Sequence, residues 1–173
     1  MDQAILANYL ASLGEHGIPG CDCVVYKDHR QIFRKTCGYA DSGRTRPVTN
    51  TNTYWLFSAT KLITCTAVMQ LVEKGSLNLD QKVSDYLPEY ENLKVRDGAV
   101  YRQAKNAMTI RHLLSMQSGL NYNTMSLSIR KVTEDTGWQA TTRQMVAALS
   151  NEPLDFEPGT RFQYSFSHDV LGA

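Results

Sequence analysis

The segment Ser58-Ala59-Thr60-Lys61, which runs directly into Leu62-Ile63-Thr64-Cys65-Thr66-Ala67-Val68-Met69, decides how this sequence is interpreted. Apolar side chains recur at helical spacing through this stretch, and Gly75 is a typical residue to end a helix. We therefore predict a helix over residues 59–74. Ser58 then lies in its first turn, and Lys61, three residues further on, shares its face.

This spacing has a chemical meaning. A serine hydroxyl is a weak nucleophile that needs an adjacent base. A lysine amine can be that base where burial or another cationic centre destabilises its ammonium form. The positive end of the helix acts in that direction, and the backbone N–H of Ser58 can stabilise a developing oxyanion. We predict Ser58 as nucleophile and Lys61 as base, although on spacing alone an ordinary helix start with a solvated lysine is an equal alternative.

The same spacing occurs a second time, in Ser128-Ile129-Arg130-Lys131. Charged residues surround this segment, and no apolar helix follows it. Its lysine is expected to stay solvated and protonated, so we interpret the segment as a surface turn without a catalytic role.

Further segments follow Ser58 in a distinctive order. They are residues 71–80, residues 83–88, residues 110–115 running into Ser118-Gly119-Leu120, and Glu157-Pro158-Gly159-Thr160-Arg161-Phe162-Gln163-Tyr164-Ser165. Together with the segment at Ser58, they resemble the serine β-lactamase-like family of class C β-lactamases, D-alanyl-D-alanine peptidases and family VIII-type carboxylesterases. The resemblance runs across nearly the whole chain.

The resemblance assigns further site residues. The family's second motif, Tyr-x-Asn after a Pro-Gly segment, falls on Tyr164, which would exchange protons with the serine and the leaving group. A core tyrosine is the alternative there. The literal Tyr90-Glu91-Asn92 lacks the Pro-Gly lead and is rejected. By its place in the pattern Asn123 is expected to line the cleft, although an asparagine that caps a loop is the more common outcome.

The sequence departs from the family pattern in two places. Phe166 stands where the motif has asparagine, and a phenyl ring cannot hydrogen-bond the lysine or a substrate amide. The family's third motif, Lys or His followed by Ser/Thr and Gly, is also missing. The similar segment Lys35-Thr36-Cys37-Gly38 belongs to an early hairpin and is therefore not this motif. We therefore expect a truncated chain, in which loss of one oxyanion donor typically costs about 10²–10³ in rate.

The predicted function is hydrolysis of esters or related acyl substrates through an acyl-enzyme at Ser58, with carboxylesterase favoured over β-lactamase activity. Phe166 is expected to contribute to substrate binding. The alternative is a catalytically incomplete fragment or a non-catalytic penicillin-binding-like module. A Ser-His-Asp triad through His168 and Asp169 is rejected, because adjacent helical residues point to different sides.

The expected fold is α+β, a truncated β-lactamase/transpeptidase-like fold in two parts. Residues 1–53 would hold an N-terminal helix capped by Asp2 and the first hairpin of the antiparallel sheet, with strands over residues 21–26 and 31–37. Residues 54–173 would form the helical subdomain, with further helices over residues 110–116 and 142–149 and a loop over residues 89–107. The exposed sheet edge is expected to favour self-association.

Composition and charge limit the classes of binding partner that we expect. The chain has 173 residues, 42% of them hydrophobic, and a formal net charge of +1, which gives no reason to expect nucleic acid or an anionic membrane as partner. The four cysteines lack a metal-ligand pattern, so we expect no metal and no cofactor, only a small-molecule ester or β-lactam-like substrate. The N-terminus lacks the features of a signal peptide. We expect a cytoplasmic protein, with an exported form trimmed of its signal as the alternative.

Overall fold

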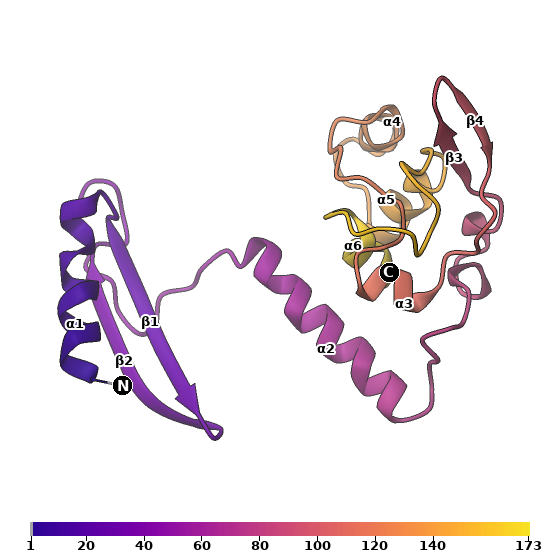
Figure 1. The fold of residues 1–173 in the computed structure, drawn as a ribbon. Helices are drawn as coiled ribbons and strands as arrows, with labels where there is room; N and C mark the ends of the chain where they lie inside the picture. The colour runs from indigo at the N-terminus through magenta and orange to yellow at the C-terminus, as the bar shows by residue number, and fades with distance from the viewer. Residues whose placement is uncertain (1) are drawn as a thin grey trace. The chain divides into compact units, whose positions relative to one another are not determined.

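The computed structural model describes residues 2–173 and divides the chain into two compact units, Met1–Trp55 and Leu56–Ala173 (Figure 1). The sequence prediction placed this boundary between residues 53 and 54. The first unit combines a helix with a hairpin, while the second combines five α-helices with a small hairpin.

The first unit contains one helix and one hairpin, as predicted. Helix α1 (Gln3–Ser12) begins at Asp2, whose carboxylate accepts the N–H of Ala4 at 2.9 Å. Strands β1 (Gly20–Lys27) and β2 (Arg30–Gly38) pair antiparallel. The turn between them has positive φ at both central residues, Asp28 and His29, which is the backbone of a tight two-residue hairpin.

The second unit begins with the helix predicted from the sequence. Helix α2 covers Thr60–Glu73 and ends at Gly75, whose φ of +70° is the left-handed conformation typical of a residue beyond a helix end. Val68 is its buried residue, whereas Leu62 is 74% exposed. The predicted apolar stripe therefore exists on the helix, but the rest of this unit covers only part of it.

A small hairpin contradicts one expectation. Residues 89–107 were predicted to be a loop, but strands β3 (Lys94–Asp97) and β4 (Val100–Gln103) pair antiparallel within them. Val95 of β3 also forms a bridge with Leu154, and both side chains are fully buried. This tertiary contact stabilises a four-residue strand that has too little local pattern to be recognised.

Four short helices complete the unit: α3 (Ile110–Leu114), α4 (Leu127–Asp135), α5 (Thr142–Leu149) and α6 (Ser167–Leu171). Helix α5 confirms the helix predicted over residues 142–149, and a capping box of Thr141 and Gln144 starts it. Helix α4 corrects the prediction of a surface turn at Ser128. Ser126 caps this helix, and its Ile129 is buried in the core, which the charged neighbours had obscured.

The core of the second unit joins all of these elements. Leu113 of α3, Val146 of α5, Leu154 and Val170 of α6 are almost fully buried in one apolar cluster. Helix α2 packs against α6 next to this cluster. Among residues 2–173, no helix is both long and apolar enough to cross a membrane.

Candidate active site

Ser58 lies at a sharp change of backbone direction. A short 3-10 helix, Phe57–Ala59, leads directly into α2. Phe57 has a φ of +44°, which residues other than glycine rarely adopt and which typically costs about 1–3 kcal/mol. The Ser58 hydroxyl is exposed beyond this turn, and its oxygen lies 2.5 Å from the Tyr164 phenol oxygen. Two residues that are far apart in the sequence thus share a short hydrogen bond.

Tyr164 is positioned by its neighbours in the chain. The Gln163 N–H donates to the Met116 carbonyl at 2.9 Å, and the Phe166 N–H donates to the Asn121 carbonyl at 3.1 Å. Because both flanking residues are bonded to the 116–121 loop, the Tyr164 backbone is held on either side of the phenol.

Buried serines support the same segment. The hydroxyl of Ser167 lies 2.7 Å from those of both Ser118 and Ser165, and all three residues are fully buried. Each hydroxyl can both donate and accept, so the cluster satisfies its own polar groups without water. It connects the start of α6 to the 116–121 loop beneath Tyr164.

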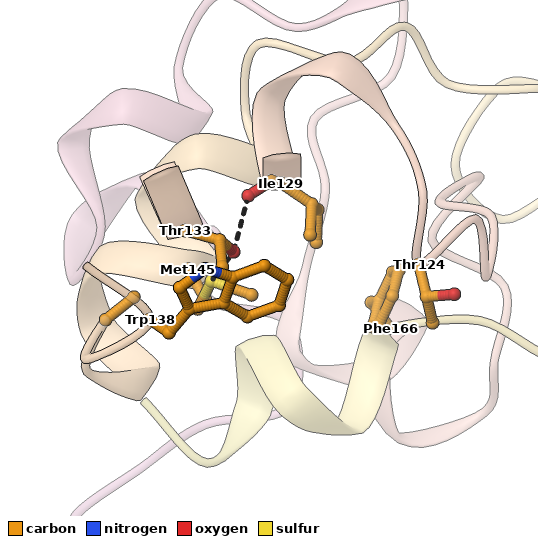
Figure 2. A pocket seen from close by; sticks show the side chains of 7 residues that line it. Thr124, Ile129, Thr133, Trp138, Met145 and Phe166 are labelled. Atoms are coloured by element: carbon orange, nitrogen blue, oxygen red, sulfur yellow. Dashed lines mark hydrogen bonds between the residues drawn. The ribbon is translucent and has the colours of Figure 1, made fainter. Parts of the chain in front are cut away.

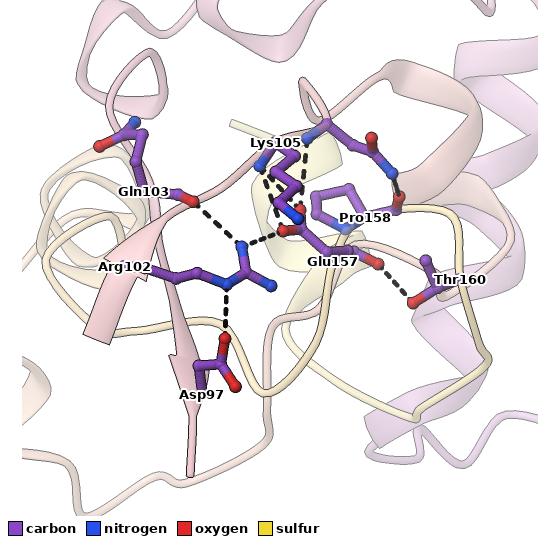
Figure 3. Close-up of polar contacts among 8 residues, drawn as sticks. Asp97, Arg102, Gln103, Lys105, Glu157, Pro158 and Thr160 are labelled. Atoms are coloured by element: carbon purple, nitrogen blue, oxygen red, sulfur yellow. Dashed lines mark hydrogen bonds and ion pairs between the residues drawn. The ribbon is translucent and has the colours of Figure 1, made fainter. Parts of the chain in front are cut away.

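The Pro-Gly lead is anchored by a second network, which Figure 3 shows. The Glu157 carboxylate forms an ion pair with Arg102 of β4 and accepts the N–H of Lys105 at 3.0 Å. Gly159 has a φ of +84°, and a Cβ there would lie 2.7 Å from the His112 ring. The unexpected β3–β4 hairpin thus helps to fix the loop that leads to Tyr164.

Lys61 extends between aromatic rings. Its ammonium lies 5.4 Å from the ring centroids of both Tyr122 and Tyr164, and its side chain is only 16% exposed. Oδ2 of the Asp169 carboxylate lies 3.9 Å from this ammonium. Lys61 is therefore largely removed from bulk water, with a phenol and a carboxylate close to its charge.

The two titratable groups next to Ser58 shift in opposite directions. Burial lowers the pKa of Lys61, but contact with the Tyr164 phenol and the Asp169 carboxylate outweighs it, so this pKa lies above its ordinary value. The hydrogen bond with Ser58 and the Lys61 ammonium hold the pKa of the Tyr164 phenol below its usual range. From the sequence we expected the ammonium form of Lys61 to be destabilised. The contacts with Tyr164 and Asp169 instead favour a charged lysine beside a more acidic phenol.

Ser58 and Lys61 line a cavity of about 450 Å³, together with other residues of α2 and α6. Its lining includes Ser58, Lys61, Thr64, Tyr122, His168 and Asp169. The His168 side chain contacts the backbone and not Asp169, since its Nε2 lies 3.1 Å from the Leu114 carbonyl oxygen. The separate directions of His168 and Asp169 agree with the rejection of a triad.

The other predicted residues lie around this centre. The Asn123 side chain accepts the N–H of Met125 at 3.0 Å and so closes a turn, while its neighbour Tyr122 lines the cavity. Phe166 packs against Tyr122 with ring centroids 4.6 Å apart. Tyr90, of the rejected motif, is a buried core residue whose hydroxyl donates to the Val146 carbonyl at 2.8 Å.

Sequence reasoning did not assign a role to Tyr122 or Asp169. Tyr122 precedes the selected Asn123 by one position, so the right loop was identified but the neighbouring side chain faces the cavity. Asp169 follows Phe166 by three positions and therefore lies one helical turn along α6. The sequence places this carboxylate on α6, but its proximity to Lys61 depends on the packing of α6 against α2.

Comparison with known proteins gives one consistent family. A family model described as Beta-lactamase matches residues 4–173. Esterase EstB of Burkholderia gladioli is 32% identical over 172 residues, which cover 94% of this chain and 41% of the esterase. Acyltransferase calJ of Penicillium decumbens is 31% identical over 197 residues, which cover 98% of this chain and 46% of the acyltransferase.

Solved structures agree with this result. EstCE1, described as a hydrolase with promiscuous acyltransferase activity, is similar with a TM-score of 0.80 and 28% identity, over 98% of this chain and 45% of its own. An octameric penicillin-binding protein homologue from Pyrococcus abyssi has a TM-score of 0.69 and 26% identity, over 99% of this chain and 37% of its own. The chain thus spans less than half the length of these relatives.

Proposed function

We propose, from the premise that this chain belongs to the Beta-lactamase family, that it carries the nucleophilic centre of a serine hydrolase that acts on esters. The observation that carries the proposal is the 2.5 Å contact between the Ser58 hydroxyl and the Tyr164 phenol, with the Lys61 ammonium beside the phenol. The esterase and acyltransferase among the relatives support an ester as substrate.

In the first half of the proposed reaction, the Tyr164 phenolate accepts the Ser58 proton while the serine oxygen forms a bond to the ester carbonyl carbon. Lys61 stays protonated and stabilises the phenolate. The tetrahedral intermediate then collapses, the bond to the alkoxide breaks, and Tyr164 returns its proton to the leaving alcohol. Ser58 is left acylated.

The second half repeats these steps in reverse. Tyr164 takes a proton from water, whose oxygen attacks the acyl carbon, and then returns that proton to Ser58 as the carboxylic acid leaves. An alcohol in place of water would give acyl transfer, which matches the described activity of calJ and EstCE1. The same groups serve both outcomes.

Phe166 argues for esters over β-lactams. The family pattern has an amide at this position, and an amide can hydrogen-bond the substrate amide of a penicillin. Loss of such a bond to a buried group typically costs about 1–3 kcal/mol. We therefore expect a short acyl ester to be hydrolysed much faster than a penicillin, and rapid penicillin turnover would contradict this choice.

A fluorophosphonate tests the proposal directly, because it forms a covalent adduct only with an activated serine. The protein is incubated with the reagent, digested and mapped by mass spectrometry. An adduct on Ser58 that is absent after pretreatment with a slowly hydrolysed ester is the expected result. Absence of any adduct would favour the non-catalytic, penicillin-binding-like alternative.

A further inference from the structure

A second cavity is lined in part by Phe166, whose ring packs against Tyr122. It has a volume of about 350 Å³, and its walls come from α4, from α5 and from the segment between them (Figure 2). The side chains that line it are mainly apolar and include Ile129, Trp138, Met145 and Phe166. Trp138 is 84% exposed and has a φ of +66°, so a large apolar side chain is held in an unusual backbone conformation at the rim.

Aromatic contacts connect this cavity to the reaction centre. The Phe166 ring lies 4.6 Å from the Tyr122 ring, and the Tyr122 ring meets that of Tyr164 edge to face at 5.1 Å. Tyr122 lines the cavity at Ser58, while Phe166 lines the second one. One continuous aromatic wall therefore leads from the Ser58 hydroxyl to an apolar cavity.

We propose that the cavity at Trp138 binds the apolar chain of the ester that is attacked at Ser58, an inference that rests on the proposed function. Apolar walls bind a hydrocarbon chain by removing it from water, and ligand sites are typically apolar clefts with few polar groups. Phe166, in the position where the family pattern has a polar residue, lines this cavity and contacts Tyr122, which lines the cavity at Ser58. The substrate class is accordingly a carboxylic ester with a medium-length apolar chain.

Two ester series test this proposal and identify which side of the ester enters the cavity. One series varies the acyl chain from two to ten carbons on p-nitrophenol, and the other varies the alcohol of acetate esters. We expect kcat/KM to rise about threefold or more per methylene in one series, until the cavity is filled. A flat profile in both series would overturn the proposal.

The variant Trp138→Ala sharpens the test, with Leu127→Ala as its control. Leu127 is an apolar residue of α4 that is 81% exposed and does not line the cavity. We expect Trp138→Ala to lower kcat/KM for the long-chain ester at least tenfold more than kcat/KM for p-nitrophenyl acetate. Leu127→Ala should change neither. An equal loss on both esters in Trp138→Ala would contradict a role in binding the chain.

Failure of the proposed function would give a different result. In that case p-nitrophenyl acetate is not hydrolysed and no adduct forms at Ser58. Binding of 1-octanol, followed by tryptophan fluorescence in the wild type and in Trp138→Phe, then examines the cavity without catalysis. Saturable quenching in the wild type that is lost in the variant is expected, and absence of quenching would overturn the cavity as an apolar site.

An independent observation concerns Asp169. Its Oδ2 atom is buried and lacks a hydrogen-bond partner among the described residues, although it lies 3.9 Å from the Lys61 ammonium. Leaving a buried carboxylate oxygen unpaired is costly. The other titratable groups around Lys61 are Tyr122 and Tyr164 from two loops and His168 from α6.

We infer that Asp169 is a positioning residue, which keeps Lys61 charged and directs its ammonium toward Tyr164 in place of the amide that Phe166 has replaced. The Asp169 charge raises the pKa of both Lys61 and Tyr164. Its removal in Asp169→Asn should therefore move both limbs of the pH profile of kcat/KM to lower pH, with a decrease in kcat of about tenfold.

The pH profile separates this role from a structural one. A merely structural residue would lower the amount of active protein and leave both limbs in place. Asp169→Glu keeps the charge and should retain the wild-type limbs. Labelling a separate aliquot with fluorophosphonate gives the fraction of active sites in Asp169→Asn, and an unshifted pH profile of the unlabelled, fully active protein would overturn the inference.

Discussion

Ser58–Lys61 and Ser128–Lys131 share one sequence spacing and differ in what surrounds it. The Ser58 hydroxyl meets a phenol at 2.5 Å, and Lys61 is only 16% exposed, between two tyrosine rings. At the second segment, the Ser128 N–H donates to the Glu152 carboxylate at 3.0 Å, and Lys131 is exposed. Both serines lie at or near the start of a helix.

The comparison teaches that the spacing supplies only the geometry of the pair. The partner of Ser58 is Tyr164, more than a hundred residues away, which offers a phenol with a lowered pKa. At Ser128 the partner is Glu152, whose carboxylate accepts from the helix start and acts as a cap. A carboxylate that stabilises a helix N-terminus has no proton to exchange at neutral pH.

Replacement of the two serines should give the largest difference between the segments. Ser58→Ala removes the proposed nucleophile, and we expect kcat/KM for p-nitrophenyl acetate to fall by about 10⁴ or more. Ser128→Ala is the matched control and should stay within about twofold of the wild type. Equal activity in both variants, measured spectrophotometrically, would remove the distinction altogether.

Replacement of Tyr164 tests the partner that distinguishes the first segment. Tyr164→Phe keeps the ring against Tyr122 but removes the proton-exchanging oxygen, and loss of a general base typically costs about 10²–10⁴. Because the Tyr164 pKa lies below its usual range, the wild-type rate should rise with pH until the phenol ionises, and this limb should disappear in the variant. Tyr90→Phe serves as a control for activity, since its hydroxyl donates to a core carbonyl. A wild-type pH profile in Tyr164→Phe would sink the assigned role.

Much of the fold could be predicted because its signals are local. Asp2, Thr141 and Gly75 mark helix ends by side-chain or backbone conformations that their residue types favour. The β3–β4 hairpin and helix α4 were missed, since their sequences are short and rich in charge. Val95 and Ile129 become core residues only through contacts with distant parts of the chain.

The site divides in the same way. The resemblance identified Ser58, Lys61 and Tyr164, and the structure brings the three together. Asp169 was not identified, because the packing of α6 against α2 brings it close to Lys61, and no spacing in the sequence reveals this packing. The direction of the Lys61 pKa was misjudged, since the expectation included burial but not the raising effect of the Tyr164 phenol and the Asp169 carboxylate.

After the replacements of Ser58 and Tyr164, replacement of Lys61, compared with replacement of Lys131, should give the next largest difference in activity. Lys61→Met keeps the length of the side chain and removes the charge that stabilises the phenolate. We expect kcat to fall about 10²–10³, as for removal of one electrostatic donor. The Tyr164 pKa should rise, so the acidic limb of the pH profile moves to higher pH. Lys131→Met should match the wild type in both rate and profile, and a comparable loss there would erase the contrast between the segments.

The smallest effect concerns the stability of the second segment. Burial raises the pKa of Glu152, but hydrogen bonds with Ser128 and Ser126 outweigh it and hold this pKa below its ordinary value. As the pH falls, Glu152 therefore takes up a proton earlier in the unfolded chain than in the folded one. The stabilisation is fully present above the ordinary glutamate pKa of 4.5 and is lost as the pH falls through the lower folded-state pKa. Glu152→Gln should lower the free energy of unfolding by about 1 kcal/mol at pH 7. The difference should vanish below the folded-state pKa.

Glu134→Gln on the same helix is the control for Glu152. The Glu134 carboxylate forms an exposed pair with Arg130 at 3.9 Å, and such pairs typically contribute less than about 0.5 kcal/mol. Urea unfolding of both variants across the acidic range measures the difference, while ester hydrolysis by the native proteins should be unaltered. If Glu152→Gln instead changed the rate and left stability intact, the second serine would have a chemical partner after all, and the contrast with Ser58 would rest on something other than the phenol.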